Sequence, residues 1–193
     1  MKYFFGFLAV IAAIVVVVLL TINLFRNLDQ PLEGTSLSTS VYDLKSDQAK
    51  DTVARYSING AIVAEENYRE VHITVSKNVR TIEIIKGYNG TVEKTATFPN
   101  TPSAYNTFVG ALVAARFSNR VDTTEVPRFT CVTGNRIFYQ LQEASEKKVD
   151  TWSTTCGADQ GNFDGSVDGT ATIFRNQIPN YGEFTSDVNL GAR

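Results

Sequence analysis

The sequence has few of the residues that most enzyme sites need. His72 is the only histidine among 193 residues, so a metal site with several histidine ligands is excluded. A Ser-His-Asp or Cys-His arrangement would have to use this one side chain, which falls on the polar side of an expected strand. No G-x-S-x-G, P-loop or dinucleotide-binding glycine pattern occurs. We therefore expect a protein without catalysis and without an organic cofactor.

Strong positive charge is also missing. The formal net charge is -2 and the sequence pI is about 5.5, whereas a nucleic-acid binder shows a basic patch or stripe. We expect no nucleic-acid partner.

A long apolar segment opens the chain. Residues 3–20 contain no charge, and only Thr21 and Asn23 interrupt the segment before Arg26. At 1.5 Å of rise per residue, such a helix crosses a hydrocarbon core of about 30 Å. The pattern predicts a transmembrane anchor over residues 1–26 that meets the lipid bilayer through residues 3–25.

Other interpretations of this segment stay open. A cleaved signal peptide has a shorter apolar region that ends at a small-residue site, and none is present here. A pilin-like leader would have Gly6-Phe7 as its junction, but Ile11 stands where such proteins carry glutamate. Lys2 and the amino terminus slightly outweigh Arg26, so the positive-inside rule favours a single-pass protein of the cell membrane with its carboxy-terminal domain outside.

The rest of the chain divides into a tether and one domain. Residues 27–51 are rich in Ser, Thr, Asp and Gln, which is typical of a flexible linker. Residues 52–193 are numerous enough to bury a core. We expect an extracytoplasmic domain over 52–193.

Alternation of apolar and polar residues predicts strands at 54–64, 71–75, 81–86 and 91–98, with a tight turn at Asn89-Gly90. A helix should follow, because Pro102 suits a first turn and apolar residues recur at helical spacing up to Phe117. A shorter helix is expected at 171–177. The fold class is therefore α+β: a transmembrane helix, then an antiparallel sheet with one or two helices packed on one face.

The two cysteines, Cys131 and Cys156, flank an expected hairpin. Its strands are 136–142 and 149–155, and its turn is 145–148. Folding the hairpin brings the cysteines together, which predicts one disulfide and an oxidising compartment. Two unrelated buried thiols are the alternative.

An Asp- and Gly-rich loop could hold a cation. Hard oxygen ligands on a turn suit Ca²⁺, but the spacing does not match an EF-hand, and an ordinary structural loop has the same composition. The candidate ligands are Asp159, Asn162, Asp164 and Asp168.

Three aromatic residues, Tyr139, Trp152 and Phe163, form a candidate ligand surface. Tyr139 and Trp152 are expected near each other across the hairpin. They either stabilise the sheet or form an exposed platform for a glycan or a peptide.

The carboxy-terminal half contains three spaced motifs: Cys131-x-x-Gly134-x-Arg136-x-x-Tyr139-x-Leu141, Trp152-x-x-x-Cys156-Gly157-x-x-x-Gly161-x-Phe163-x-Gly165 and Phe174-x-x-Gln177-Ile178-Pro179-x-Tyr181. With these motifs, this half resembles uncharacterised single-pass membrane proteins of small-genome candidate-phylum bacteria. The resemblance implies a bacterial envelope location and a paired Cys131–Cys156, and it implies no catalytic residue.

The sequence thus favours a membrane-anchored extracytoplasmic binding or assembly module of the cell envelope, with a protein or glycan partner. The alternatives are an envelope hydrolase with paired carboxylates and a pilin-like filament subunit. A flat aromatic surface or an edge-strand surface would favour binding, and a deep pocket with two carboxylates about 5–10 Å apart would favour the hydrolase.

Overall fold

The computed structural model describes residue 44 and residues 51–123, 126–127, 130–157 and 161–191. All of these belong to one compact unit. The expected membrane segment, and the tether apart from Leu44 and Asp51, lie outside the described residues. Within the described ranges, no helix combines the length and apolar character needed to cross a bilayer.

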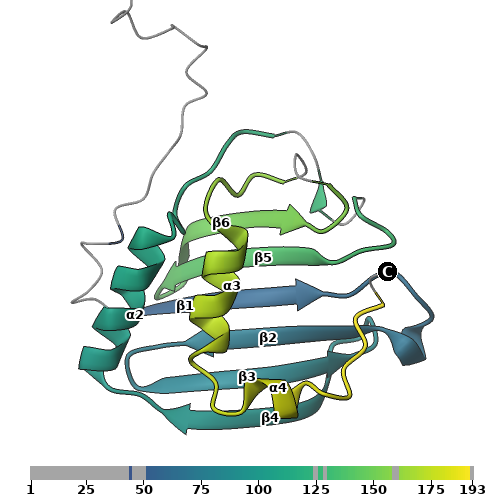
Figure 1. Cartoon of the computed structure of the whole chain (residues 1–193), viewed down its shortest axis with the longest axis horizontal. Coiled ribbons are helices and arrows are strands. Elements are labelled where there is room, and N and C mark those ends of the chain that lie inside the picture. Colours follow the sequence, from purple (N-terminus) through teal and green to yellow (C-terminus); the bar gives the residue numbers. More distant parts are fainter. Residues whose placement is uncertain (1–43, 45–50, 124–125, 128–129, 158–160, 192–193) are drawn as a thin grey trace, which may run out of the picture. The chain divides into compact units, whose positions relative to one another are not determined.

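Six antiparallel strands form one sheet in the order β4-β3-β2-β1-β5-β6 (Figure 1). The first four form a meander, and β5 then pairs with the free side of β1. Their bounds are β1 (Thr52–Asn59), β2 (Arg69–Val75), β3 (Val79–Lys86), β4 (Thr91–Pro99), β5 (Arg136–Glu143) and β6 (Glu146–Thr154).

The meander confirms the strands expected from alternation. Val71, Ile73 and Val75 of β2 are almost fully buried, whereas the intervening residues are only half-buried. The β3–β4 turn uses Gly87 and Gly90 at positive φ, where glycine is favoured. One face of the meander therefore belongs to the core.

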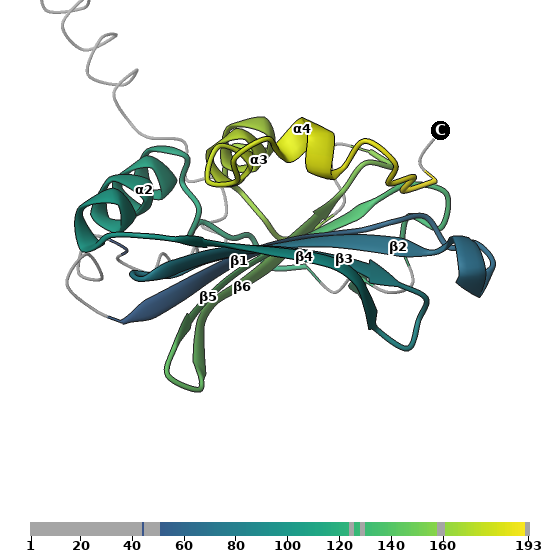
Figure 2. The ribbon, with the colours of Figure 1, turned by 90° about the horizontal axis from the view of Figure 1, so that it is seen from below.

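The α-helices of the described residues all lie on that face, as Figure 2 shows. They are α2 (Pro102–Ala114), α3 (Val167–Arg175) and α4 (Tyr181–Phe184). Thr101 caps α2 by accepting a hydrogen bond from Ala104 N, and Pro102 stands in its first turn. The α+β class, with an antiparallel sheet and helices on one face, is confirmed.

Aromatic rings form the centre of the core between the sheet and the helices. Phe174 of α3 stacks on Tyr56 of β1 at 5.4 Å and meets Phe108 of α2 edge-on at 5.2 Å between ring centroids. Leu44 is 2% exposed and belongs to the same core. A residue of the expected tether therefore packs in the core of the domain.

Several expected element bounds were wrong. The first strand ends at Asn59 rather than at residue 64, because Ala61 N leaves the β1–β2 ladder and bonds to Leu190 O. Helix α3, expected over 171–177, begins at Val167, because the Ser166 side chain caps it by accepting from Gly169 N.

The hairpin turn was also placed too late. Residues 146–148 belong to β6, and Ala144, at positive φ, lies in the turn instead.

Candidate binding edge of the sheet

The two outer strands of the sheet end in different ways. Beyond β6, Asn162 N and Phe163 N both donate to Trp152 O, at 3.0 and 3.1 Å. The Asn162 side chain completes the contact, since its Oδ1 accepts from Trp152 N at 2.8 Å. Residues 161–163 thus form a strap that covers the edge of β6 in its carboxy-terminal half.

Glycine is required in this strap. Gly161 has φ +120°, and a Cβ there would lie 2.4 Å from Trp152 O, so only glycine fits without displacement of the backbone. The strap is held in turn by Val121 N, which donates to Asn162 O at 2.9 Å.

The remaining half of the β6 edge carries charges. Lys147 bonds to Asp150 at 2.8 Å, and Lys148 bonds to Glu146 at 2.6 Å. Charged side chains on an edge strand discourage pairing with another chain. The β6 edge is therefore protected along its whole length, by the strap and by charge.

The opposite edge, β4, has no such cover among the described residues. No described segment pairs with its outer side, and Thr95 and Thr97 are exposed. Asn100 N donates to Asn78 O at 2.8 Å. Asn78 and Asn100 are therefore a hydrogen-bonded pair that continues the β3–β4 ladder. Because such pairs alternate, Ala96 and Phe98 direct their main-chain groups toward β3, and Thr95 and Thr97 direct theirs outward.

One half of β4 retains protective features. The register of the β3–β4 ladder shifts between Ile84 and Ile85, opposite Glu93, and bulges and charges both discourage edge pairing. Lys94 bonds to Asp187 at 2.5 and 2.6 Å. From Thr95 to Ala115, by contrast, the sequence contains no charge. The open part of the edge is therefore the half that begins at Thr95.

A cavity of about 380 Å³ lies beside this edge on the helix side of the sheet. Phe98 and Phe184 give it an apolar lining, and Lys94 and Glu183 give it charge. The full set of lining residues is Lys94, Phe98, Pro179, Asn180, Glu183 and Phe184. An extended chain added to β4 would direct alternate side chains toward this cavity.

The single histidine belongs to a hydrogen-bonded network on the face of the sheet opposite the helices. Glu70 accepts from Asn59 at 2.8 Å and from Tyr68 at 2.7 Å, and its second oxygen lies 2.8 Å from His72 Nε2. Burial opposes ionisation of Glu70, but the hydrogen bonds from His72 and Tyr68 outweigh it and hold the pKa of this carboxyl below its usual range. His72 was expected at the surface. It is instead half-buried, and its side chain is hydrogen-bonded to Glu70.

Two adjacent glutamates line another cavity, of about 320 Å³, beside the β3–β4 turn. Glu65 and Glu66 belong to the short helix η2 (Glu65–Asn67) and are exposed. Glu65 also accepts from Asn89 at 2.8 Å. Consecutive exposed carboxylates on one helical turn do not face each other across a substrate, as glycoside hydrolysis needs.

The three aromatic residues of the candidate ligand surface do not form an exposed platform. Tyr139 has no exposed surface, and its ring stacks on Phe163 at 3.8 Å. Trp152 is 5% exposed, and its cross-strand neighbour is Phe138 rather than Tyr139. Tyr139 and Trp152 therefore point to opposite faces of the sheet, because successive side chains alternate. Tyr139 and Phe163 thus belong to the core, and Trp152 is buried on the other face.

The Asp- and Gly-rich loop has structural uses in this fold. Asn162 belongs to the strap, and Asp168 lies in the first turn of α3, where a negative charge is favourable. Asp159 is outside the described residues. Among the residues that are described, no group of three or more His, Cys, Asp or Glu side chains could hold a metal ion.

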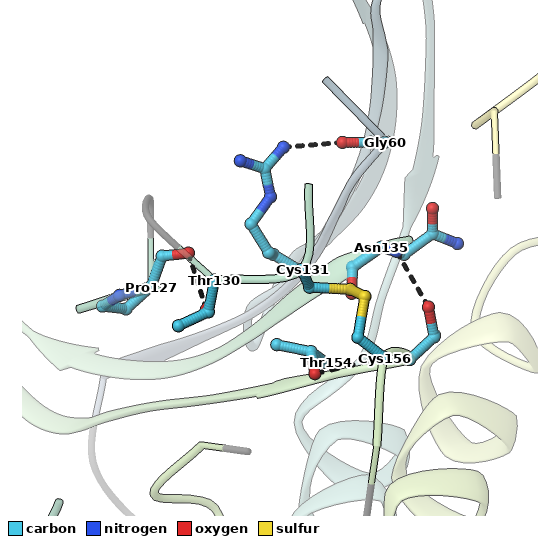
Figure 3. Close-up of a disulfide and its surroundings, with 9 residues drawn as sticks. Gly60, Pro127, Thr130, Cys131, Asn135, Thr154 and Cys156 are labelled. Carbon is cyan, nitrogen blue, oxygen red and sulfur yellow. Dashed lines mark hydrogen bonds between the residues drawn. A yellow bond between two sulfur atoms is a disulfide. The ribbon is translucent and has the colours of Figure 1, made fainter. Parts of the chain in front are cut away.

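The expected disulfide is present (Figure 3). Cys131 and Cys156 are joined, with 5.3 Å between their Cα atoms. A Cβ on Gly134 would lie 2.7 and 3.0 Å from the two sulfurs, so this glycine leaves the space that the bond occupies. The disulfide ties the segment before β5 to the end of β6.

The open edge was not predicted, because four strands in sequence do not reveal which one lies outermost. One signal in the sequence pointed to it: the polar residues of 91–98 are mainly threonine, and this strand is followed directly by a helix. No protein-family model matches the chain, and no curated protein is significantly similar to it.

Proposed function

We propose that this protein is a single-pass, membrane-anchored binding or assembly module of the bacterial cell envelope. Its domain faces outward and receives an extended segment of an envelope protein along β4. The observation that carries the proposal is the contrast between the covered β6 edge and the open main-chain groups of Thr95 and Thr97.

Addition of a strand to an open edge is an established mode of peptide recognition. Main-chain hydrogen bonds supply affinity, and pockets for alternate side chains supply specificity. β4 offers both features, because the cavity lined by Phe98 and Phe184 lies beside its open half. This edge favours a protein partner over a glycan.

The proposed location rests on three observations. The apolar segment 3–20 is long enough for an anchor, the Cys131–Cys156 disulfide suits an oxidising compartment, and the carboxy-terminal motifs resemble those of bacterial membrane proteins. A non-reducing peptide map of the native membrane protein tests it. The cross-linked Cys131–Cys156 peptide is expected, and two free thiols would reverse the proposed orientation.

Site-specific photocross-linking tests the binding edge. A benzophenone amino acid at position 97 of the full chain, in native membranes, should link to a neighbouring polypeptide, and the same probe at the exposed face of β5, at position 140, should not. Adding Thr95→Pro should abolish the product, because proline removes an outward N–H. Equal products at both positions, or insensitivity to Thr95→Pro, would refute the proposal.

A further inference from the structure

The open half of β4 can pair with itself. In a pair related by a two-fold axis perpendicular to the sheet, opposite residues must point to the same face. In each allowed register, therefore, one residue of β4 lies directly opposite the same residue of the second copy. The two-fold axis passes between these two residues, and each register is named below by that residue. The candidates in β4 run from Glu93 to Thr97, and charge and hydrogen bonding decide among them.

Like charges exclude two of these registers. An axis at Glu93 places two carboxylates directly opposite each other, and an axis at Lys94 does the same with two ammonium groups. Like charges at directly opposite positions destabilise an antiparallel pair.

Hydrogen bonding decides among the other three. An axis at Thr95 requires Thr97 to pair with Glu93, which faces the irregularity in the β3–β4 ladder. An axis at Thr97 places Thr95 opposite Pro99, which has no N–H. An axis at Ala96 places Thr95 of each copy opposite Thr97 of the other copy. The outward N–H and C=O groups of both residues then form hydrogen bonds.

The side chains agree with the axis at Ala96. On the helix side of the sheet, the small Ala96 meets its own copy in a non-hydrogen-bonded pair, the kind of pair in which opposite Cα atoms lie closest together. Phe98 of the second copy lies opposite Lys94 at the cavity that Phe184 also lines. On the other face, threonine lies opposite threonine, a pairing that favours sheet formation.

We propose that β4 receives β4 of a second copy of this chain, antiparallel, about a two-fold axis at Ala96. This inference rests on the proposed use of the β4 edge and names its partner. Two sheets then join into one continuous sheet across the copies. Anchoring in a shared bilayer would raise the effective concentration of the second copy.

Disulfide trapping tests the register on the purified full chain in detergent micelles. Thr95→Cys and Thr97→Cys proteins, mixed and oxidised, should form a reductant-sensitive mixed dimer, because a hydrogen-bonded pair has Cα atoms about 5.5 Å apart, within disulfide range. Each variant alone should cross-link far less. Asp150→Cys, at an exposed position on the β6 edge, is the matched control and should remain monomeric. Equal trapping in all samples, or none, would overturn the inference.

Charge pairs provide a second test that does not depend on cysteine chemistry. A Thr95→Lys, Thr97→Glu double variant places opposite charges across the axis twice, and a Thr95→Lys, Thr97→Lys variant places like charges there. The dimer dissociation constants, measured by analytical ultracentrifugation, should differ by about tenfold. Equal constants would refute the register, and thermal melts of both variants confirm that the fold is intact.

The failures of the two proposals can be told apart. If the purified chain stays monomeric while the probe at position 97 links to a different protein in membranes, the self-pairing inference falls and the proposed function stands. If neither experiment gives a product, both fall.

Discussion

The two edge strands of this sheet differ in whether their outward main-chain groups are covered. At β6, a strap of three residues occupies the outer hydrogen-bonding groups of Trp152, and salt bridges occupy the rest of the strand. At β4, the bulge and Lys94 protect one half, and Thr95 and Thr97 leave the other half open. The same domain thus contains a covered edge strand, β6, and an open edge strand, β4. The fold therefore allows an edge to be covered, and β4 is left open in spite of this.

The largest expected effect comes from proline substitutions at neighbouring positions of β4. Ala96→Pro should cost about 3 kcal/mol of unfolding free energy, because its N–H belongs to the β3–β4 ladder. Thr95→Pro should cost less than about 1 kcal/mol, because its N–H faces outward. Urea denaturation of both variants measures the difference. Equal losses would mean that the outward direction assigned to Thr95 is wrong.

Removal of the disulfide should weaken the closed side. Replacing Cys131 and Cys156 together by serine opens a loop with a sequence separation of 25 residues and should cost about 3 kcal/mol on the chain-entropy model. Calorimetry of the oxidised protein and the double variant gives the value. Amide exchange by local opening should rise more in β5 and β6 than in β4, and an equal rise across the sheet would contradict this local role.

Opening the strap would make the β6 edge resemble β4. Gly161→Ala should cost about 2 kcal/mol, because the new Cβ meets a backbone oxygen and the native φ suits only glycine. Gly157→Ala is the matched control, since nothing lies near its added Cβ. Faster exchange of the Trp152 amide in the first variant alone is the expected result. Similar behaviour of the two variants would show that the strap does not protect the edge.

Acid should lower the stability of the domain through Glu70, which lies on the interior strand β2 rather than on an edge strand. Because the folded state lowers the pKa of Glu70, its contribution is complete above the ordinary glutamate pKa of about 4.3 and is lost as pH falls below that value. Glu70→Gln should remove about 1 kcal/mol of the stability change between pH 5 and pH 3. Thermal melts across this range test it, with Glu83→Gln, opposite His72 in the sheet, as control. An unchanged pH profile in Glu70→Gln would contradict the assignment.

Local patterns in the sequence predicted most elements of the fold. Alternation located the meander, Thr101 and Pro102 located the start of α2, and the hairpin brought Cys131 and Cys156 together. These signals succeed because each depends on residues close in sequence. The end of β1 was misplaced because Leu190, far along the chain, bonds to Ala61.

The candidate site depended on information that the sequence does not hold locally. Whether Tyr139 and Trp152 are exposed depends on the strand register and on Phe163, and the register pairs Trp152 with Phe138. Which strand is outermost depends on where β5 inserts, beside β1 and not beside β4. Both facts are long-range, and so the sequence left open whether these aromatic side chains are buried and did not reveal the open edge.

The burial of Leu44 has a mechanical consequence. Leu44 and β1 are the first described parts of the chain, and β1 is an interior strand with ladders on both sides. Tension that arrives from the amino-terminal side therefore enters the sheet at an interior strand. A load between the amino-terminal side and a strand held by β4 would pass through β1, β2 and β3 as shear along their hydrogen-bonded ladders. In that geometry many hydrogen bonds would resist the force together, rather than opening one at a time.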